Sequence, residues 1–183
     1  ETSDPHILAA GDCTEKHHFI TKKPVAGRIR GPAVIQGRLA AKRLAGYSIE
    51  FQGVLNSMAV RVFDKYAAAT GLTEEEAQDI EGFETVSAMV DSRSKHGMIE
   101  GAKPWTIKLV FQKDTQRLIG GQILSDSLAP LKEIDTVTAL ILGEKTIEDL
   151  TTLMCAGHPD CSSEPSLEPI SIAAEQALQK LRN

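Results

Sequence analysis

Residues 3–12 read Ser3-Asp4-Pro5-His6-Ile7-Leu8-Ala9-Ala10-Gly11-Asp12. Because the residue before a proline avoids the helical region, Asp4-Pro5 predicts a turn. The apolar run of residues 6–10 predicts a strand, since it is too brief for a helix. It ends at Gly11-Asp12, which places a carboxylate where ligands bind at the ends of parallel strands. Two interpretations remain open: Asp12 contacts a ligand, or the strand simply leaves its sheet through a Gly-Asp turn.

A helix is predicted about twenty residues further on, from Gly31 or Pro32 to about Ala45. Pro32 suits the first turn of a helix, where its missing N–H is not needed, and Gly46 suits the end. Gly37 inside the helix costs about 1 kcal/mol relative to alanine, and close packing against another backbone would explain it. The N–H groups at the start of such a helix, together with its dipole, favour negative charge.

The strand, the basic loop and the helix together resemble the last part of the FAD domain in the flavoprotein pyridine nucleotide-disulfide oxidoreductases. The remainder of the chain resembles their C-terminal dimerisation domain. Three stretches are most similar to the NADH oxidase and CoA-disulfide reductase branch: Gly53-Val54-Leu55, Val62-Phe63-Asp64 and Thr70-Gly71-Leu72-Thr73-Glu74. The resemblance covers nearly the whole chain. It implies that residues 1–46 end an FAD-binding domain and that residues 47–183 form the dimerisation domain.

The resemblance also implies which residues meet the cofactor. Gly11 and Asp12 would contact the ribitol or pyrophosphate of FAD, and the helix start at Pro32 and Ala33 would face the flavin pyrimidine ring. In the intact parent, NAD(P)H would reduce FAD, and electrons would pass to oxygen or a disulfide through a cysteine outside this sequence. Because the sequence has no GxGxxG fingerprint, we expect no FAD in this segment alone and no activity.

Composition is typical of a globular protein, with 183 residues, 42% hydrophobic and 25% charged. No apolar run approaches the roughly 18 residues that a membrane span needs, and the polar start does not resemble a signal peptide. Cys13, Cys155 and Cys161 form neither a CxxC pair nor an even-numbered framework, which favours a reducing, cytoplasmic setting. Because the chain lacks an initiating Met, we expect a C-terminal fragment of a longer polypeptide.

Charge divides the chain unevenly. Residues 13–46 have a net charge of +7, and residues 47–183 have one of −9, so Gly46-Tyr47 is a candidate domain boundary. The loop of residues 13–30 lacks interleaved aromatic residues apart from Phe19, which argues against nucleic acid as a partner. We therefore predict a solvated surface loop, with His17 and His18 also at the surface. Its basic residues are Lys16, Lys22, Lys23, Arg28 and Arg30.

The part from residue 47 onward is predicted to be α+β, an antiparallel sheet with helices packed on one face, because strands come first and helices follow. Gly120-Gly121 indicates a bulge or a tight contact inside a strand. Thr73 with Glu76 predicts a capping box at the start of a short helix. The other predicted strands cover residues 54–68, 83–90, 105–111 and 117–124, and the other predicted helices cover residues 130–142, 146–154 and 169–181.

Residues 155–168 hold a second group of chemically capable side chains. His158 could act in acid–base chemistry, with Glu164 fixing its tautomer. A metal at Cys155, His158 and Cys161 is disfavoured, because structural zinc sites use four ligands. The third interpretation is a plain connection before the last helix.

The resemblance bears on this segment as well. The disulfide reductases carry a His-Pro followed by a Glu here, and that His serves the active site of the other subunit. In this chain Glu164 lies six residues after His158, one more than in the usual pattern. The NADH oxidase branch often lacks the His-Pro altogether.

The resemblance implies a homodimer. We expect its apolar surface on residues 105–124 and on the helices that carry Val137, Ile141 and Ile172, with the strand of residues 7–10 as a further exposed edge. The rival interpretation is a stand-alone α+β interaction module without a redox role. Two GxGxxG units upstream would decide for the oxidoreductase.

Overall fold

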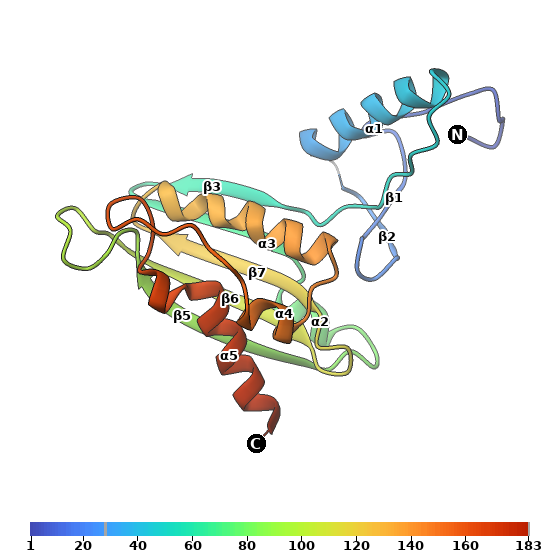
Figure 1. The fold of residues 1–183 in the computed structure, drawn as a ribbon. Coiled ribbons are helices and arrows are strands. Elements are labelled where there is room, and N and C mark those ends of the chain that lie inside the picture. The colour runs from blue at the N-terminus through green and yellow to red at the C-terminus, as the bar shows by residue number, and fades with distance from the viewer. Residues whose placement is uncertain (28, 183) are drawn as a thin grey trace. The chain divides into compact units, whose positions relative to one another are not determined.

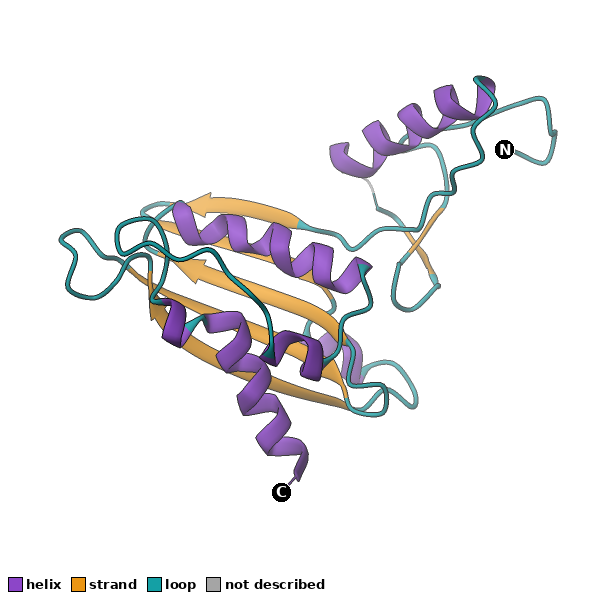
Figure 2. Ribbon diagram, viewed as in Figure 1, coloured by secondary structure: helices purple, strands orange, loops and turns teal. Residues whose placement is uncertain are grey.

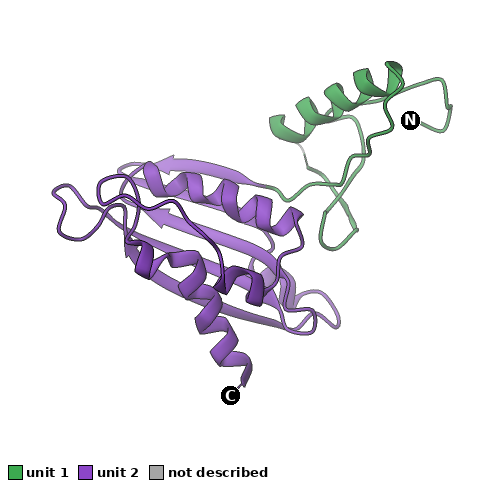
Figure 3. Cartoon of the chain, in the orientation of Figure 1, with its two compact units in different colours: residues 1–56 green, residues 57–183 purple. Residues whose placement is uncertain are grey.

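The computed structural model describes residues 1–27 and 29–182, so the predicted role of Arg28 lies outside the described residues. Figure 1 traces the chain in order, and Figure 2 marks its helices and strands. The chain divides into two compact units, residues 1–56 and residues 57–183 (Figure 3). The first unit carries the Gly-Asp stretch, and the second carries the α+β part.

The first unit contains a two-stranded antiparallel ribbon and one long helix. Strand β1 (Lys16–His17) pairs with β2 (Pro24–Val25), and α1 (Arg30–Leu44) follows. The turn at Asp4-Pro5 is confirmed, since the Ile7 amide donates to the Asp4 carbonyl at 3.1 Å. The strand predicted for residues 6–10 is wrong, because residues 7–10 have no regular structure. A parallel strand needs neighbours to pair its N–H and C=O groups, and no described strand of this chain pairs with it.

Helix α1 confirms the sequence prediction at both ends. Pro32 lies in its first turn, and Gly46 follows the helix with φ of +87°, a left-handed conformation that glycine adopts without strain. The Gly46 amide donates to the Arg43 carbonyl at 3.0 Å, and the next amide reaches back to Lys42. The close packing expected at Gly37 is absent from the described chain, since a Cβ added there would meet nothing within 4 Å.

The small core of the first unit contains two residues that were predicted at the surface. Lys16 and His18 are buried together with Val54 and Leu55. The ribbon lies against the segment around Val54, because the Phe19 amide donates to the Val54 carbonyl at 2.8 Å and the Val54 amide donates to the His17 carbonyl at 2.9 Å. The prediction of a fully solvated basic loop is therefore wrong at Lys16 and His18.

The second unit is built on a five-stranded antiparallel sheet with the strand order β3-β4-β7-β6-β5 (Figure 1). The strand predicted for residues 54–68 is wrong, because the chain reverses at Phe63 and forms a hairpin of two strands. Phe63 has φ of +54° and is 90% exposed. The strands are β3 (Met58–Val62), β4 (Lys65–Gly71), β5 (Thr85–Arg93), β6 (Pro104–Gln112) and β7 (Leu118–Ser125).

Helices cover one face of this sheet, as predicted (Figure 2). The capping boxes of Thr73 with Glu76 and of Thr146 with Asp149 are both present. The helical segments are α2 (Glu74–Gln78), η1 (Ala129–Lys132), α3 (Glu133–Leu142), α4 (Ile147–Thr151), η2 (Pro165–Leu167) and α5 (Pro169–Arg182). Helices α3, α4 and α5 supply the covering layer.

The tight contact predicted at Gly120-Gly121 is confirmed. A Cβ on Gly120 would lie 1.8 Å from the Leu72 carbonyl oxygen, and one on Gly121 would lie 2.6 Å from Cγ1 of Val137. Glycine therefore lets the Leu72 backbone and α3 approach β7 closely.

The predicted exposed apolar surface is largely wrong. Trp105, Val137 and Ile141 are buried in the core of the second unit, and Ile172 is half-buried. The helices bury the apolar residues on the sheet face that they cover, so the exposed apolar residues of the strands lie on the opposite face. We call this surface the open sheet face, and its large apolar members are Met58, Val60, Val62, Met89 and Leu124.

Candidate functional site

The Gly11-Asp12 pair forms a turn that is fixed to α1. The Thr14 amide donates to the Gly11 carbonyl at 3.1 Å, which closes the turn around Asp12. The Gly11 amide donates to Oε1 of Gln36 at 3.0 Å. Gln36 lies on α1, about one helical turn after Pro32. The pair therefore lies beside the first turns of α1, although no strand leads into it.

Asp12 is exposed and borders an open hollow of about 420 Å³ within the first unit. Its carboxylate takes part in none of the hydrogen bonds between described residues, so it is available to a ligand. The other residues around this hollow are Cys13, Thr14, Glu15, Pro24, Val25 and Ala26.

The start of α1 fits the edge of an electron-rich ligand. Its first turn contains no acidic residue, and Ile29 at the N-cap makes no side-chain cap hydrogen bond. Pro32 and Ala33 are half-buried there. With the helix dipole unopposed by a carboxylate, this end favours negative charge in a bound group.

The second candidate group lies on the segment before α5, where His158 and Glu164 have different partners. Nδ1 of His158 accepts from the Asp160 amide at 3.2 Å, so in the neutral ring the proton sits on Nε2. Glu164 accepts from the Ser166 hydroxyl at 2.6 Å, and its Oε2 lies 3.7 Å from Nε2 of His96. The expected hydrogen bond between His158 and Glu164 is not among the contacts of the described residues.

His96 also belongs to this group, although no sequence pattern marks it. Its amide donates to the Pro159 carbonyl at 3.0 Å, and the neighbouring Lys95 pairs with Asp160 at 2.5 Å. The hydrogen bond from Lys95 lowers the pKa of Asp160, and the lysine charge adds to the effect. The loop after β5 therefore holds the His158 segment in place. No local pattern signals this, because the two loops are far apart in sequence.

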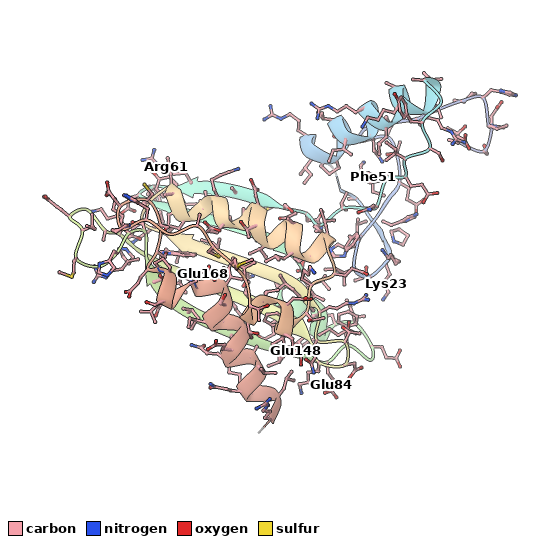
Figure 4. The ribbon with its side chains drawn as sticks, viewed as in Figure 1. Lys23, Phe51, Arg61, Glu84, Glu148 and Glu168 are labelled. Atoms are coloured by element: carbon pink, nitrogen blue, oxygen red, sulfur yellow. The ribbon has the colours of Figure 1, made fainter. Side chains whose placement is uncertain are left out.

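A cavity of about 340 Å³ lies between this segment and α3. Burial raises the pKa of Glu133, and burial also raises the pKa of the Cys155 thiol, with the nearby carboxylates of Glu168 and Glu133 adding to it. Glu168, labelled in Figure 4, lies just before α5. Such a thiol stays protonated and is a weak nucleophile. Within residues 1–27 and 29–182, no group of three His, Cys, Asp or Glu side chains could hold a metal ion.

An antiparallel sheet with helices on one face, preceded by a Gly-Asp turn fixed to a helix, defines the class of this protein as α+β. The dimerisation domain of the pyridine nucleotide-disulphide oxidoreductases matches residues 58–168. The chain therefore belongs to the pyridine nucleotide-disulphide oxidoreductase family.

Known relatives extend the match across the whole chain. The NADH oxidase of Methanocaldococcus jannaschii is 32% identical over 183 residues, which are all of this chain and 40% of that protein. The structure of an NAD-dependent persulfide reductase from A. fulgidus aligns with a TM-score of 0.89 at 30% identity, covering 97% of this chain and 32% of that one. An FAD-dependent oxidoreductase of this family from Desulfovibrio vulgaris aligns with a TM-score of 0.77 at 29% identity, covering 99% and 40%.

The chain is much shorter than these relatives. It spans about 40% of the length of the M. jannaschii NADH oxidase. The family match favours the oxidoreductase over the stand-alone interaction module. Among the helices of the described residues, none has the length and apolar character to cross a membrane.

Proposed function

We propose that this chain is the C-terminal part of an FAD-dependent NAD(P)H oxidoreductase of the NADH oxidase type. Residues 1–46 close the flavin site, and residues 47–183 form the dimerisation domain. The observation that carries this proposal is the Asp12 turn, which is fixed to α1 and precedes the matched dimerisation domain in the chain. FAD in this proposal belongs to the longer polypeptide, and we expect none in the segment alone.

Gly11 and Asp12 hold the cofactor in this proposal, together with the start of α1 at Pro32 and Ala33. The carboxylate of Asp12 accepts hydrogen bonds from cofactor hydroxyls, and the helix dipole favours electron density on the ring that faces it. FAD held by these residues would supply two-electron redox chemistry between NAD(P)H and an acceptor, either oxygen or a disulfide. The relatives carry names of both kinds, an NADH oxidase and a persulfide reductase.

His158 is proposed to serve the active site of the partner subunit. Support comes from its exposed side chain and from the hydrogen bond that Nδ1 accepts from the Asp160 amide, which leaves Nε2 to carry the proton of the neutral ring. Glu164 contributes by holding His96, and thereby the loop that supports the His158 segment. In this proposal the enzyme is a cytoplasmic homodimer that binds neither nucleic acid nor membrane.

The test is the Asp12→Ala variant of the intact flavoprotein. Removing the carboxylate strands cofactor hydroxyls and costs about 1–3 kcal/mol, so the affinity for FAD should fall by roughly 5- to 150-fold. The measurement is the flavin content per polypeptide after gel filtration, with oligomeric mass recorded in the same run. Glu15→Ala is the matched control, because Glu15 borders the same hollow. Unchanged flavin content in the Asp12 variant would contradict the assignment.

A further inference from the structure

Lys16 is a buried charge inside the first unit. It is 1% exposed, and its stem fills the space beside Gly27, where an added Cβ would lie 2.8 Å from Lys16 Cδ. Its ammonium donates to the Gly11 carbonyl at 2.8 Å and to the Thr14 carbonyl at 3.3 Å. Among the residues that the structure describes, no carboxylate lies within ion-pair distance of it.

Burying an ammonium group costs free energy unless its N–H groups find hydrogen-bond acceptors. Most lysines avoid this cost by keeping the charged group in water. Here the satisfaction comes from two carbonyls of a single turn, which encloses Asp12. The position of the turn and the burial of Lys16 therefore depend on each other. A lysine in this place stabilises one geometry of the backbone around Asp12.

Thr14 and Gln36 fix the same turn through further hydrogen bonds. The Thr14 hydroxyl lies 2.8 Å from the Gly11 carbonyl and 3.0 Å from Oε1 of Gln36, and Oε1 also accepts from the Gly11 amide. Gly11 is thus held at both its N–H and its C=O. We call the three side chains of Lys16, Thr14 and Gln36 the Gly11 clamp.

The clamp acts on the backbone and leaves the Asp12 carboxylate unengaged. We propose that Lys16, Thr14 and Gln36 are positioning residues for the FAD contact of Asp12, an inference that rests on the proposed function. A turn held at three points presents the carboxylate in one place, so cofactor binding does not have to order it. If the turn were mobile, FAD binding would have to order it, and the affinity for FAD would be lower.

The test measures FAD affinity in the intact flavoprotein, by adding FAD to the apoprotein and following flavin fluorescence. Lys16→Met keeps the apolar stem and removes the ammonium. Thr14→Val removes the hydroxyl, and Thr14→Ser, its matched control, keeps it. We expect Lys16→Met and Thr14→Val to weaken FAD binding about tenfold, since each removes clamp hydrogen bonds, and Thr14→Ser to bind almost as the parent does.

Coupling to Asp12 separates positioning from general stability. In the Asp12→Ala background, Lys16→Met and Thr14→Val should weaken FAD binding much less than they do in the parent, because the carboxylate that they position is gone. The inference would be overturned if the clamp substitutions lowered the affinity for FAD by the same factor with and without Asp12. Full affinity for FAD in both Lys16→Met and Thr14→Val would overturn it as well. If Asp12→Ala itself keeps full affinity, the proposed function fails instead. Thermal unfolding checks each variant, and if Lys16→Met does not fold, the Thr14 pair decides alone.

Discussion

At the scale of single residues, the stability that a charged side chain contributes depends on its hydrogen-bond partners. Glu74 at the start of α2 accepts from Nζ of Lys108 at 2.5 Å and from the Ser87 hydroxyl at 3.0 Å. The hydrogen bond from Lys108 lowers the pKa of Glu74 below 4.5, partly opposed by burial. This cluster joins α2 to β5 and β6, so its charge state is linked to the stability of the sheet.

Glu74→Gln should destabilise the chain by about 1 kcal/mol at neutral pH, a modest figure because both side chains are partly exposed and screened by solvent. A lowered carboxyl pKa gives stability that is fully present above the unfolded value of 4.5 and is lost as pH falls through the folded pKa. Urea unfolding should therefore show the gap between wild type and variant closing below pH 4.5.

Glu75→Gln is the matched control for this prediction, because Glu75 is exposed on the same short helix. Its stability should follow that of the wild type at every pH. A gap for Glu74→Gln that stayed constant into acid would mean that the pKa of Glu74 is not lowered.

Residue-scale features could be predicted where the cause is local. The Asp4-Pro5 turn, the glycine stop at Gly46 and the capping box at Thr73 each depend on side chains a few residues apart. Lys16 and His96 were missed because their partners come from other segments of the chain. Only the fold brings the carbonyls of Gly11 and Thr14 to a lysine that reads as ordinary surface charge.

At the scale of elements, apolar periodicity predicted most helices and strands. It failed where the formation of a strand depends on pairing with another strand. Residues 54–68 carry strand-forming side chains throughout, and nothing in their composition marks the reversal at Phe63. Residues 7–10 have the composition of a buried strand, yet a strand exists only beside a partner, and the described chain supplies none. A Gly-Asp turn was one of the two interpretations left open for Gly11 and Asp12, and the attachment of this pair to Gln36 was not predicted.

Two Gly→Ala substitutions test the packing of these elements. Gly120→Ala places a Cβ against the Leu72 carbonyl, where the backbone must shift, so it should cost about 3 kcal/mol or more. Gly37→Ala meets open space inside α1 and should stabilise the chain by about 0.5–1 kcal/mol through better helix propensity. Urea unfolding followed by circular dichroism measures both, and equal stability of the two variants would refute the packing described for β7.

At the scale of the whole molecule, the family match makes association the central question. The sequence could not show which face of the sheet the helices cover, so it assigned buried residues such as Trp105 and Val137 to the interface. The structure instead leaves the open sheet face exposed, with Val60 at 49% and Met89 at 63%. Monomeric proteins rarely expose large contiguous apolar patches, whereas obligate dimers bury more than about 2,000 Å² in total.

The family match assigns residues 58–168 to a dimerisation domain, so the mass of this chain in solution is the decisive measurement. Multi-angle light scattering during gel filtration, at micromolar concentration, gives the mass without assumptions about shape. We expect twice the mass of the 19.8 kDa chain. A mass of 19.8 kDa that stays constant across the concentration range would contradict it.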